Sequence, residues 1–264
     1  MNRLLVVFFA IVTMSSCTSK FQKILKNKDT DYKVKMAEQF YKEKKYSNAQ
    51  QLFESTIQFV KGTPRYEEIY LMYANAYYYD KDYENAENLF KTFIEYFPNS
   101  AKVEEVEFNR ANTYYLRSPK AELDQTTTNR AIMLMQSFID AHPTSPKVKD
   151  ATEVIDACRA KLELKDYKTA SLYYNLALYR AAAITYGLLS DGYPDSKSAD
   201  KYKLLTLKSY YMFAENSYVE KQKERFDKVT EEYNDFVDRF SDSPLLEEAK
   251  KIKKQTDNFL NIKK

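Results

Sequence analysis

The chain has 264 residues, of which 44% are hydrophobic and 30% are charged, and its formal net charge is +3 at pH 7. This is the composition of an ordinary folded protein, and the near balance of charge argues against nucleic acid as a partner. With three glycines and seven prolines, the chain has too few turn residues for a β-sandwich or a barrel.

Residues 1–16 have the features of a secretion signal. Arg3 precedes nine apolar residues (4–12), and this stretch is too short to cross a bilayer, which takes about 20 residues. Small residues then precede Cys17, as in the signal of a bacterial lipoprotein, although Met14 stands where leucine is usual. The alternative is an ordinary exported protein in which Cys17 has no special role.

The likeness to a lipoprotein signal implies that Cys17 is lipidated and becomes the first mature residue, followed by a linker over residues 17–29. Two or more acyl chains hold a protein stably on a membrane, so this anchor alone would provide the membrane contact. Thr18 stands where aspartate often marks inner-membrane retention, which favours the outer membrane. The other cysteine, Cys158, has apolar neighbours at helical spacing and is expected to be a buried thiol.

The rest of the chain repeats one helical phrase. Four turns of similar sequence, FPNS, HPTS, YPDS and FSDS, begin at residues 97, 142, 193 and 240. Before each turn, a small residue is followed four positions later by a large apolar one, as at Ala86 and Phe90. Further upstream stand the aromatic pairs Phe40-Tyr41, Tyr77-Tyr78, Tyr114-Tyr115, Tyr173-Tyr174 and Tyr210-Tyr211.

This order of small, aromatic and turn residues predicts an all-α fold, a superhelical array of about five tetratricopeptide-like repeats. Each repeat is a helical hairpin that buries its apolar face only by stacking on its neighbours. The expected repeats cover residues 30–64, 67–100, 104–145, 163–196 and 200–243.

The third and fifth repeats depart from this pattern. Each is expected to have a longer loop before its second helix, within residues 117–130 and 213–228. An added helix is expected after each of these repeats, at residues 145–162 and 243–260. The last helix has apolar residues that need a neighbour, so it either caps the array or docks on a partner.

Residues suited to catalysis are scarce. His142 is the only histidine and stands where other repeats have phenylalanine or tyrosine, so we expect it to have a packing role. No histidines and cysteines have the spacing of metal ligands, and three scattered glycines form no phosphate-binding loop. We therefore expect a binding protein with no catalytic or metal site, no cofactor and no small-molecule substrate.

A row of tyrosine and asparagine residues is the candidate binding site. The second member of each aromatic pair is expected to face the groove lined by the first helices of the repeats. There the rings would suit apolar or aromatic side chains, and the amides would suit the backbone of an extended peptide. Alternatively, the tyrosines pack between neighbouring helices. The candidates are Tyr41, Asn75, Tyr78, Tyr79, Asn112, Tyr115 and Tyr174.

The lipoprotein signal, the five repeats, the stretch LDQTTT, the added helices and the YPDS turn together resemble the BamD (ComL or YfiO) family of lipoproteins. The resemblance implies an outer-membrane protein that faces the periplasm and belongs to the β-barrel assembly (BAM) complex. Its implied partners are the barrel subunit BamA and unfolded outer-membrane proteins. By region, it assigns residues 30–145 to substrate and residues 146–264 to docking on BamA.

Two other classes remain open. One is a periplasmic repeat lipoprotein that scaffolds cell-wall enzymes. The other is a nutrient-binding lipoprotein of the SusD type, which is normally a much longer chain. Identification of the protein that co-purifies from membranes distinguishes the three classes.

Overall fold

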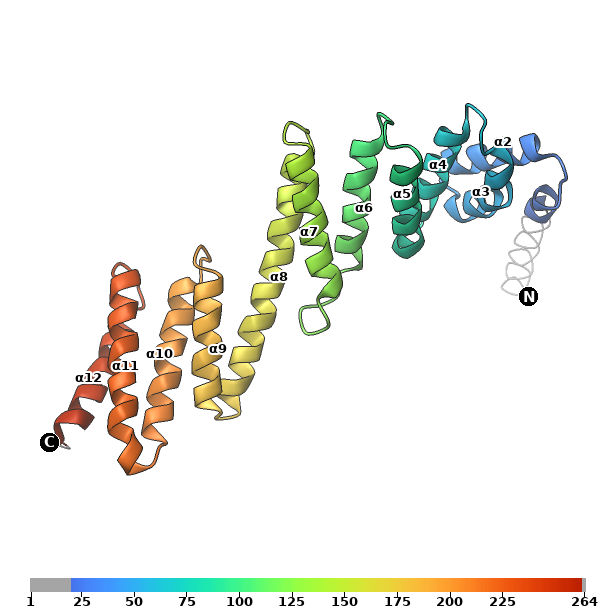
Figure 1. Cartoon of the computed structure of the whole chain (residues 1–264). Coiled ribbons are helices and arrows are strands. Elements are labelled where there is room, and N and C mark those ends of the chain that lie inside the picture. The colour runs from blue at the N-terminus through green and yellow to red at the C-terminus, as the bar shows by residue number, and fades with distance from the viewer. Residues whose placement is uncertain (1–19, 263–264) are drawn as a thin grey trace, which may run out of the picture. The chain divides into compact units, whose positions relative to one another are not determined.

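The computed structural model describes residues 20–262, so the predicted signal and Cys17 lie outside the described part of the chain. The described residues form helices and no strand (Figure 1), which confirms the all-α prediction. None of the described helices is long and apolar enough to cross a membrane. The helices are α2 (Thr30–Lys42), α3 (Tyr46–Val60), α4 (Tyr66–Tyr79), α5 (Tyr83–Tyr96), α6 (Val103–Arg117), α7 (Thr126–Ala141), α8 (Val148–Asn175), α9 (Tyr179–Gly192), α10 (Ala199–Glu215), α11 (Val219–Arg239) and α12 (Leu246–Ile262).

Consecutive helices form hairpins at the five predicted places, which are α2–α3, α4–α5, α6–α7, α8–α9 and α10–α11. The small residues of the repeat phrase lie where the helices cross. Ala49, Ala86, Ala131 and Ala182 have no exposed surface, so the helix axes can approach closely at these points.

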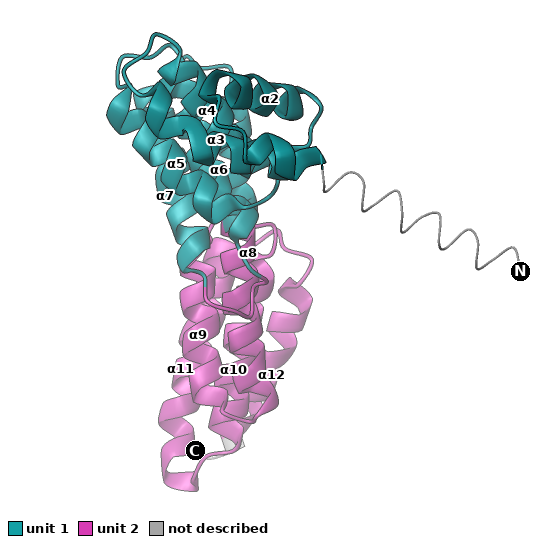
Figure 2. Cartoon of the chain, turned by 90° about the vertical axis from the view of Figure 1, so that its right-hand side faces the viewer, with its two compact units in different colours: residues 1–119, 125–158 teal, residues 120–124, 159–264 magenta. Residues whose placement is uncertain are grey.

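The chain divides into two compact units, which Figure 2 shows in different colours. Unit 1 comprises residues 1–119 and 125–158, and unit 2 comprises residues 120–124 and 159–264. The boundary therefore lies within α8. The division of function expected between residues 145 and 146 stays a prediction.

The serine that ends each recurring turn closes the hairpin that precedes it. Its hydroxyl donates a hydrogen bond to a carboxylate of that hairpin's first helix, near the helix start in three cases and within α8 in the fourth, and it accepts one from the backbone two residues later. The donor bonds join Ser100 to Glu67, Ser145 to Glu104 and Ser196 to Glu163 at 2.5 Å each, and Ser243 to Asp200 at 2.6 Å. The repeated turn sequence thus encodes a repeated closing contact.

Three turns within hairpins use a left-handed backbone without glycine. Lys44, Lys81 and Ala177 have φ angles of 59°, 67° and 58°. Each follows the end of a first helix, where carbonyls of the aromatic pair accept bonds from the turn, as from Lys81 N to Tyr78 O at 3.1 Å. A residue with a Cβ is strained in this conformation, whereas glycine adopts it freely.

We expect Lys81→Gly to stabilise unit 1 by about 0.5–1 kcal/mol, because it removes the strain of the left-handed backbone. Urea unfolding followed by circular dichroism measures the change. Lys91→Gly is the matched control, since Lys91 lies inside α5, where glycine should cost about 1 kcal/mol. Effects of the same sign at the two positions would contradict the assignment of strain to Lys81.

Three helices, α8, α10 and α11, are longer than the sequence pattern predicted. The added helix and the first helix of the fourth repeat form one continuous helix, α8, of 28 residues. No glycine or proline occurs within α8, so nothing interrupts it. The long loop expected in the third repeat is present at residues 118–125. The prediction of a long loop in the fifth repeat is wrong. There α10 and α11 extend towards each other and leave only residues 216–218 between them, since this stretch also has no helix breaker.

Each end of the described chain has a helix whose apolar residues pack inward. Residues 20–25 are helical rather than an extended linker, and the Phe21 ring lies 5.8 Å from the Phe40 ring. In α12, Ile252 is buried, and the Phe259 ring lies 4.2 Å from the Phe226 ring. The apolar residues of α12 are thus used within unit 2, which favours a capping role over docking.

Candidate peptide-binding site

Tyr78, at the centre of the predicted row, packs within unit 1. Its ring lies 5.8 Å from the rings of both Tyr83 and Phe90, and its hydroxyl accepts a hydrogen bond of 2.7 Å from Asn112 Nδ2. Burial raises the pKa of Tyr78. These contacts support the packing interpretation for Tyr78 and Asn112, which join the second repeat to the third.

A hydrogen bond between a tyrosine and an asparagine also joins the first repeat to the second. Asn75, in α4, hydrogen-bonds to the side chain of Tyr41, and burial raises the pKa of Tyr41 to about 12. Asn75 is 8% exposed, and its Oδ1 atom is buried without a hydrogen-bond partner.

Tyr79 is the exposed member of the row in the second repeat. Its side chain is 48% exposed and lies against Tyr41 and Tyr46, with ring centroids 6.3 and 5.2 Å away. Tyr41 and Tyr46 are themselves 5.7 Å apart. The structure therefore brings Tyr41, Asn75 and Tyr79 together, and it adds Tyr46, which the sequence reasoning missed.

A sequence signal for Tyr46 existed. A tyrosine opens α3, α5 and α9, each time five residues after the second member of an aromatic pair. The resulting ring contacts are alike, at 5.7 Å for Tyr41–Tyr46, 5.8 Å for Tyr78–Tyr83 and 5.4 Å for Tyr174–Tyr179.

The other two predicted tyrosines are placed differently. Tyr115 is half-buried in α6 of unit 1. Tyr174 belongs to unit 2, where it packs beside a core that contains Ala170 and Tyr186. We therefore treat residues of unit 1 alone as the candidate peptide site.

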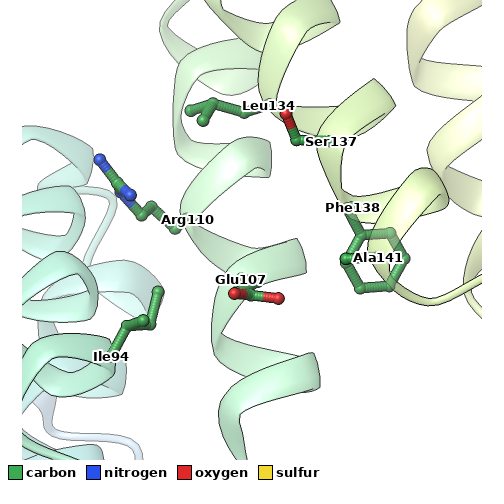
Figure 3. A pocket seen from close by; sticks show the side chains of 7 residues that line it. All are labelled: Ile94, Glu107, Arg110, Leu134, Ser137, Phe138 and Ala141. Carbon is green, nitrogen blue, oxygen red and sulfur yellow. The ribbon is translucent and has the colours of Figure 1, made fainter. Parts of the chain in front are cut away.

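A hollow of about 300 Å³ lies among α5, α6 and α7. Figure 3 shows Glu107 and Arg110, both from α6, among the side chains that line it. Both charges are already engaged, since Glu107 contacts His142 at 2.6 Å and Arg110 pairs with Glu87 at 2.8 Å. His142 also packs on Phe138, in accord with the packing role expected for it. The other lining residues are Ile94, Leu134, Ser137, Phe138 and Ala141.

Unit 2 has an exposed apolar surface, which we call the α9 surface. It surrounds an open hollow of about 460 Å³ whose lining includes Leu178, Ile184 and Phe213. Arg180 lines this hollow and also a neighbouring one, whose lining includes Arg225 and two lysine–glutamate pairs, Lys221–Glu224 and Lys228–Glu231. The exposed apolar residues of α8, α9 and the turn between them are Leu164, Leu172, Leu176, Leu178, Ile184 and Leu188.

Stacked helical hairpins, an open cluster of tyrosine rings and an exposed apolar surface define a repeat protein of the kind that binds other proteins. Residues 27–226 match the model of the YfiO family, described as outer membrane lipoproteins. The chain belongs to this family. The match confirms the resemblance drawn from the sequence and the assignment as an outer-membrane lipoprotein.

Other comparisons add little. No individual curated protein matches the chain at a significant level. A solved structure, the TPR2AB-domain:pHSP90-complex of yeast Sti1, is 13% identical and covers 86% of this chain and 98% of its own. Its TM-score is 0.38, and we draw no argument from it. Among residues 20–262, no group of three histidine, cysteine, aspartate or glutamate side chains could hold a metal ion.

Proposed function

We propose that the protein is a non-enzymatic, lipid-anchored subunit of the outer-membrane β-barrel assembly machinery. Cys17 carries the anchor, and the folded chain faces the periplasm. Unit 2 docks on a BamA-like barrel subunit, and unit 1 binds unfolded outer-membrane proteins before they insert. The family match over residues 27–226 supports the setting in outer-membrane assembly.

The α9 surface is the observation that carries the docking proposal. Leu188 is 68% exposed and Ile184 is 47% exposed, and the two lie one helical turn apart on α9. A group of large apolar side chains in water marks a protein-interaction surface more often than chance exposure does. Arg180, which lines the hollow of the α9 surface, suits a partner surface in which a carboxylate flanks apolar side chains.

The tyrosines of unit 1 support the second part of the proposal. Tyr41, Tyr46 and Tyr79 form one partly exposed aromatic surface, and the buried Oδ1 of Asn75 lies beside Tyr41. An extended chain presents alternate side chains on one face and free backbone N–H groups at its edge. Rings and amide together therefore suit a chain that has not yet formed its barrel.

We expect Ile184→Asp to weaken co-purification of the barrel subunit at least tenfold, because it places a charge in an apolar contact. The measurement is a pull-down of the full-length lipoprotein from detergent-solubilised membranes, with the captured proteins identified by mass spectrometry. Circular dichroism establishes that the variant stays folded.

Met133→Asp in unit 1 is the matched control, since Met133 is 46% exposed and also lies on a helix surface. It should leave the barrel subunit bound. Capture of a cell-wall enzyme in place of a barrel would overturn the proposal and favour the scaffold class. Equal capture by the Ile184→Asp variant would move the docking surface away from α9.

A further inference from the structure

The aromatic surface of unit 1 has a charge beside it. Tyr41, Tyr46 and Tyr79 come from α2, α3 and α4, with ring centroids 5.2–6.3 Å apart, and we call these three rings the tyrosine platform. The face of an aromatic ring carries partial negative charge, so the platform attracts a cation that lies over it.

Glu105, near the start of α6, adds a full negative charge. Its carboxylate lies close enough to Tyr79 to raise the pKa of that residue, after burial, which is the larger cause, and it is the last of the causes that act on the pKa of Tyr41. The nearest cation to Glu105 is Lys102, at 3.9 Å, and both side chains of this pair are about half exposed. An exposed pair of this kind is weak, so a ligand cation can compete with Lys102 for Glu105.

One lysine of the turn after α2 is engaged by neighbouring residues. Lys45 is paired with Glu43 at 2.7 Å, and its ammonium lies over the ring of Phe40. The buried Oδ1 of Asn75, next to Tyr41, is a further acceptor without a donor. The rings and the carboxylate favour a group that is positively charged and donates hydrogen bonds.

We propose that the tyrosine platform with Glu105 is a subsite for a lysine or arginine side chain of an extended polypeptide. The inference rests on the proposed function, because it names what the ligand of unit 1 presents at this point. It goes beyond the interpretation of the tyrosine row as a site for apolar or aromatic side chains and the peptide backbone. Unfolded chains would be held by apolar residues along the row and by a cation at the platform.

The test uses three capped, fluorescently labelled peptides of seven residues in which threonine and tyrosine alternate around a central position. That position is lysine, norleucine or glutamate, so the three differ only in the charge offered to the platform. We expect the lysine peptide to bind the full mature chain about fivefold more tightly than the norleucine peptide, or about 1 kcal/mol. Fluorescence anisotropy measures the three dissociation constants.

Substitutions identify the residues that produce the preference for the lysine peptide. Tyr79→Ala should abolish the preference for lysine, whereas Tyr79→Phe, which keeps the ring, should retain it. Glu105→Gln should reduce the preference to about twofold. Tyr96→Ala is the matched control, since Tyr96 is 51% exposed on α5 of the same unit, and it should leave the preference unchanged.

Equal binding of the lysine and norleucine peptides to the wild-type chain would overturn the subsite. If Tyr79→Ala then weakened both peptides alike, the row would remain a peptide site without charge preference. Tightest binding of the glutamate peptide, or no binding of any peptide, would also overturn it. None of these outcomes tests the proposed docking of unit 2, which the pull-down measures separately.

Discussion

Lys203→Met should destabilise unit 2 by about 3 kcal/mol, because it removes the buried cation that pairs with the largely buried carboxylate of Glu232. The Lys203 side chain is 7% exposed in α10, and its ammonium lies 2.6 Å from Glu232 and also contacts Asp235, both on α11. Glu232 is itself 12% exposed and keeps only Lys228, at 3.1 Å, after the substitution. Urea denaturation followed by circular dichroism measures the loss.

Two further variants separate the buried charge from a simple loss of contacts. Lys208→Met removes a neighbouring cation of α10 that pairs with Glu248 at 2.7 Å, but both side chains are about a third to a half exposed. This control should cost less than 1 kcal/mol. The double variant Lys203→Met/Glu232→Leu should recover more than half of the loss, since an apolar pair can replace a buried ion pair. Equal losses for the Lys203 and Lys208 variants would show that burial of the ion pair is unimportant.

The repeat itself could be predicted because its signals are local. Small and large residues recur at helical spacing, and each hairpin ends in the same four-residue turn. The contact made by the turn serine could not be predicted with the same ease. Ser100 and Glu67 are 33 residues apart in the sequence, at the end and the start of one hairpin. The sequence contains many other acidic residues that could have been the partner of Ser100.

Two adjacent tyrosines show why the candidate site could be predicted only in part from the sequence. Tyr78 and Tyr79 have the same chemistry, but Tyr78 faces Phe90 and Asn112, whereas Tyr79 faces Tyr46 and solvent. Neighbours on a helix point about 100° apart, so which of them is exposed depends on how the next hairpin packs. Glu105 was recognisable only as a helix residue until α6 was placed beside α4.

Stability should fall steeply between about pH 10 and pH 12, because several tyrosines hold their protons more tightly in the folded chain. Burial is the main cause that raises the pKa of Tyr41, Tyr70, Tyr193 and Tyr202 from the ordinary tyrosine value of 10.0 to about 12. Above pH 10 the unfolded chain releases these protons while the folded chain keeps them. The stabilisation is therefore complete below pH 10 and is lost as the pH rises towards 12.

Each such tyrosine contributes a slope of up to about 1.4 kcal/mol per pH unit, so together they can exhaust the stability of an ordinary domain. Lys228, whose pKa is raised to about 12 by Glu231 and Glu232 against the opposing effect of burial, acts in the same direction. Urea unfolding at closely spaced pH values measures the total slope.

Tyr70→Phe isolates one contribution, because Tyr70 is 6% exposed and phenylalanine keeps its ring while removing the proton. The variant should lose stability less steeply above pH 10, by up to about 1.4 kcal/mol per pH unit. Any constant loss from the hydrogen bond between Tyr70 and Thr92 appears equally at pH 8 and does not alter the slope. Tyr218→Phe is the matched control, since Tyr218 is 84% exposed and its substitution should leave the slope unchanged. If the slopes of wild type and Tyr70→Phe coincide, burial of this hydroxyl does not contribute to the alkaline transition.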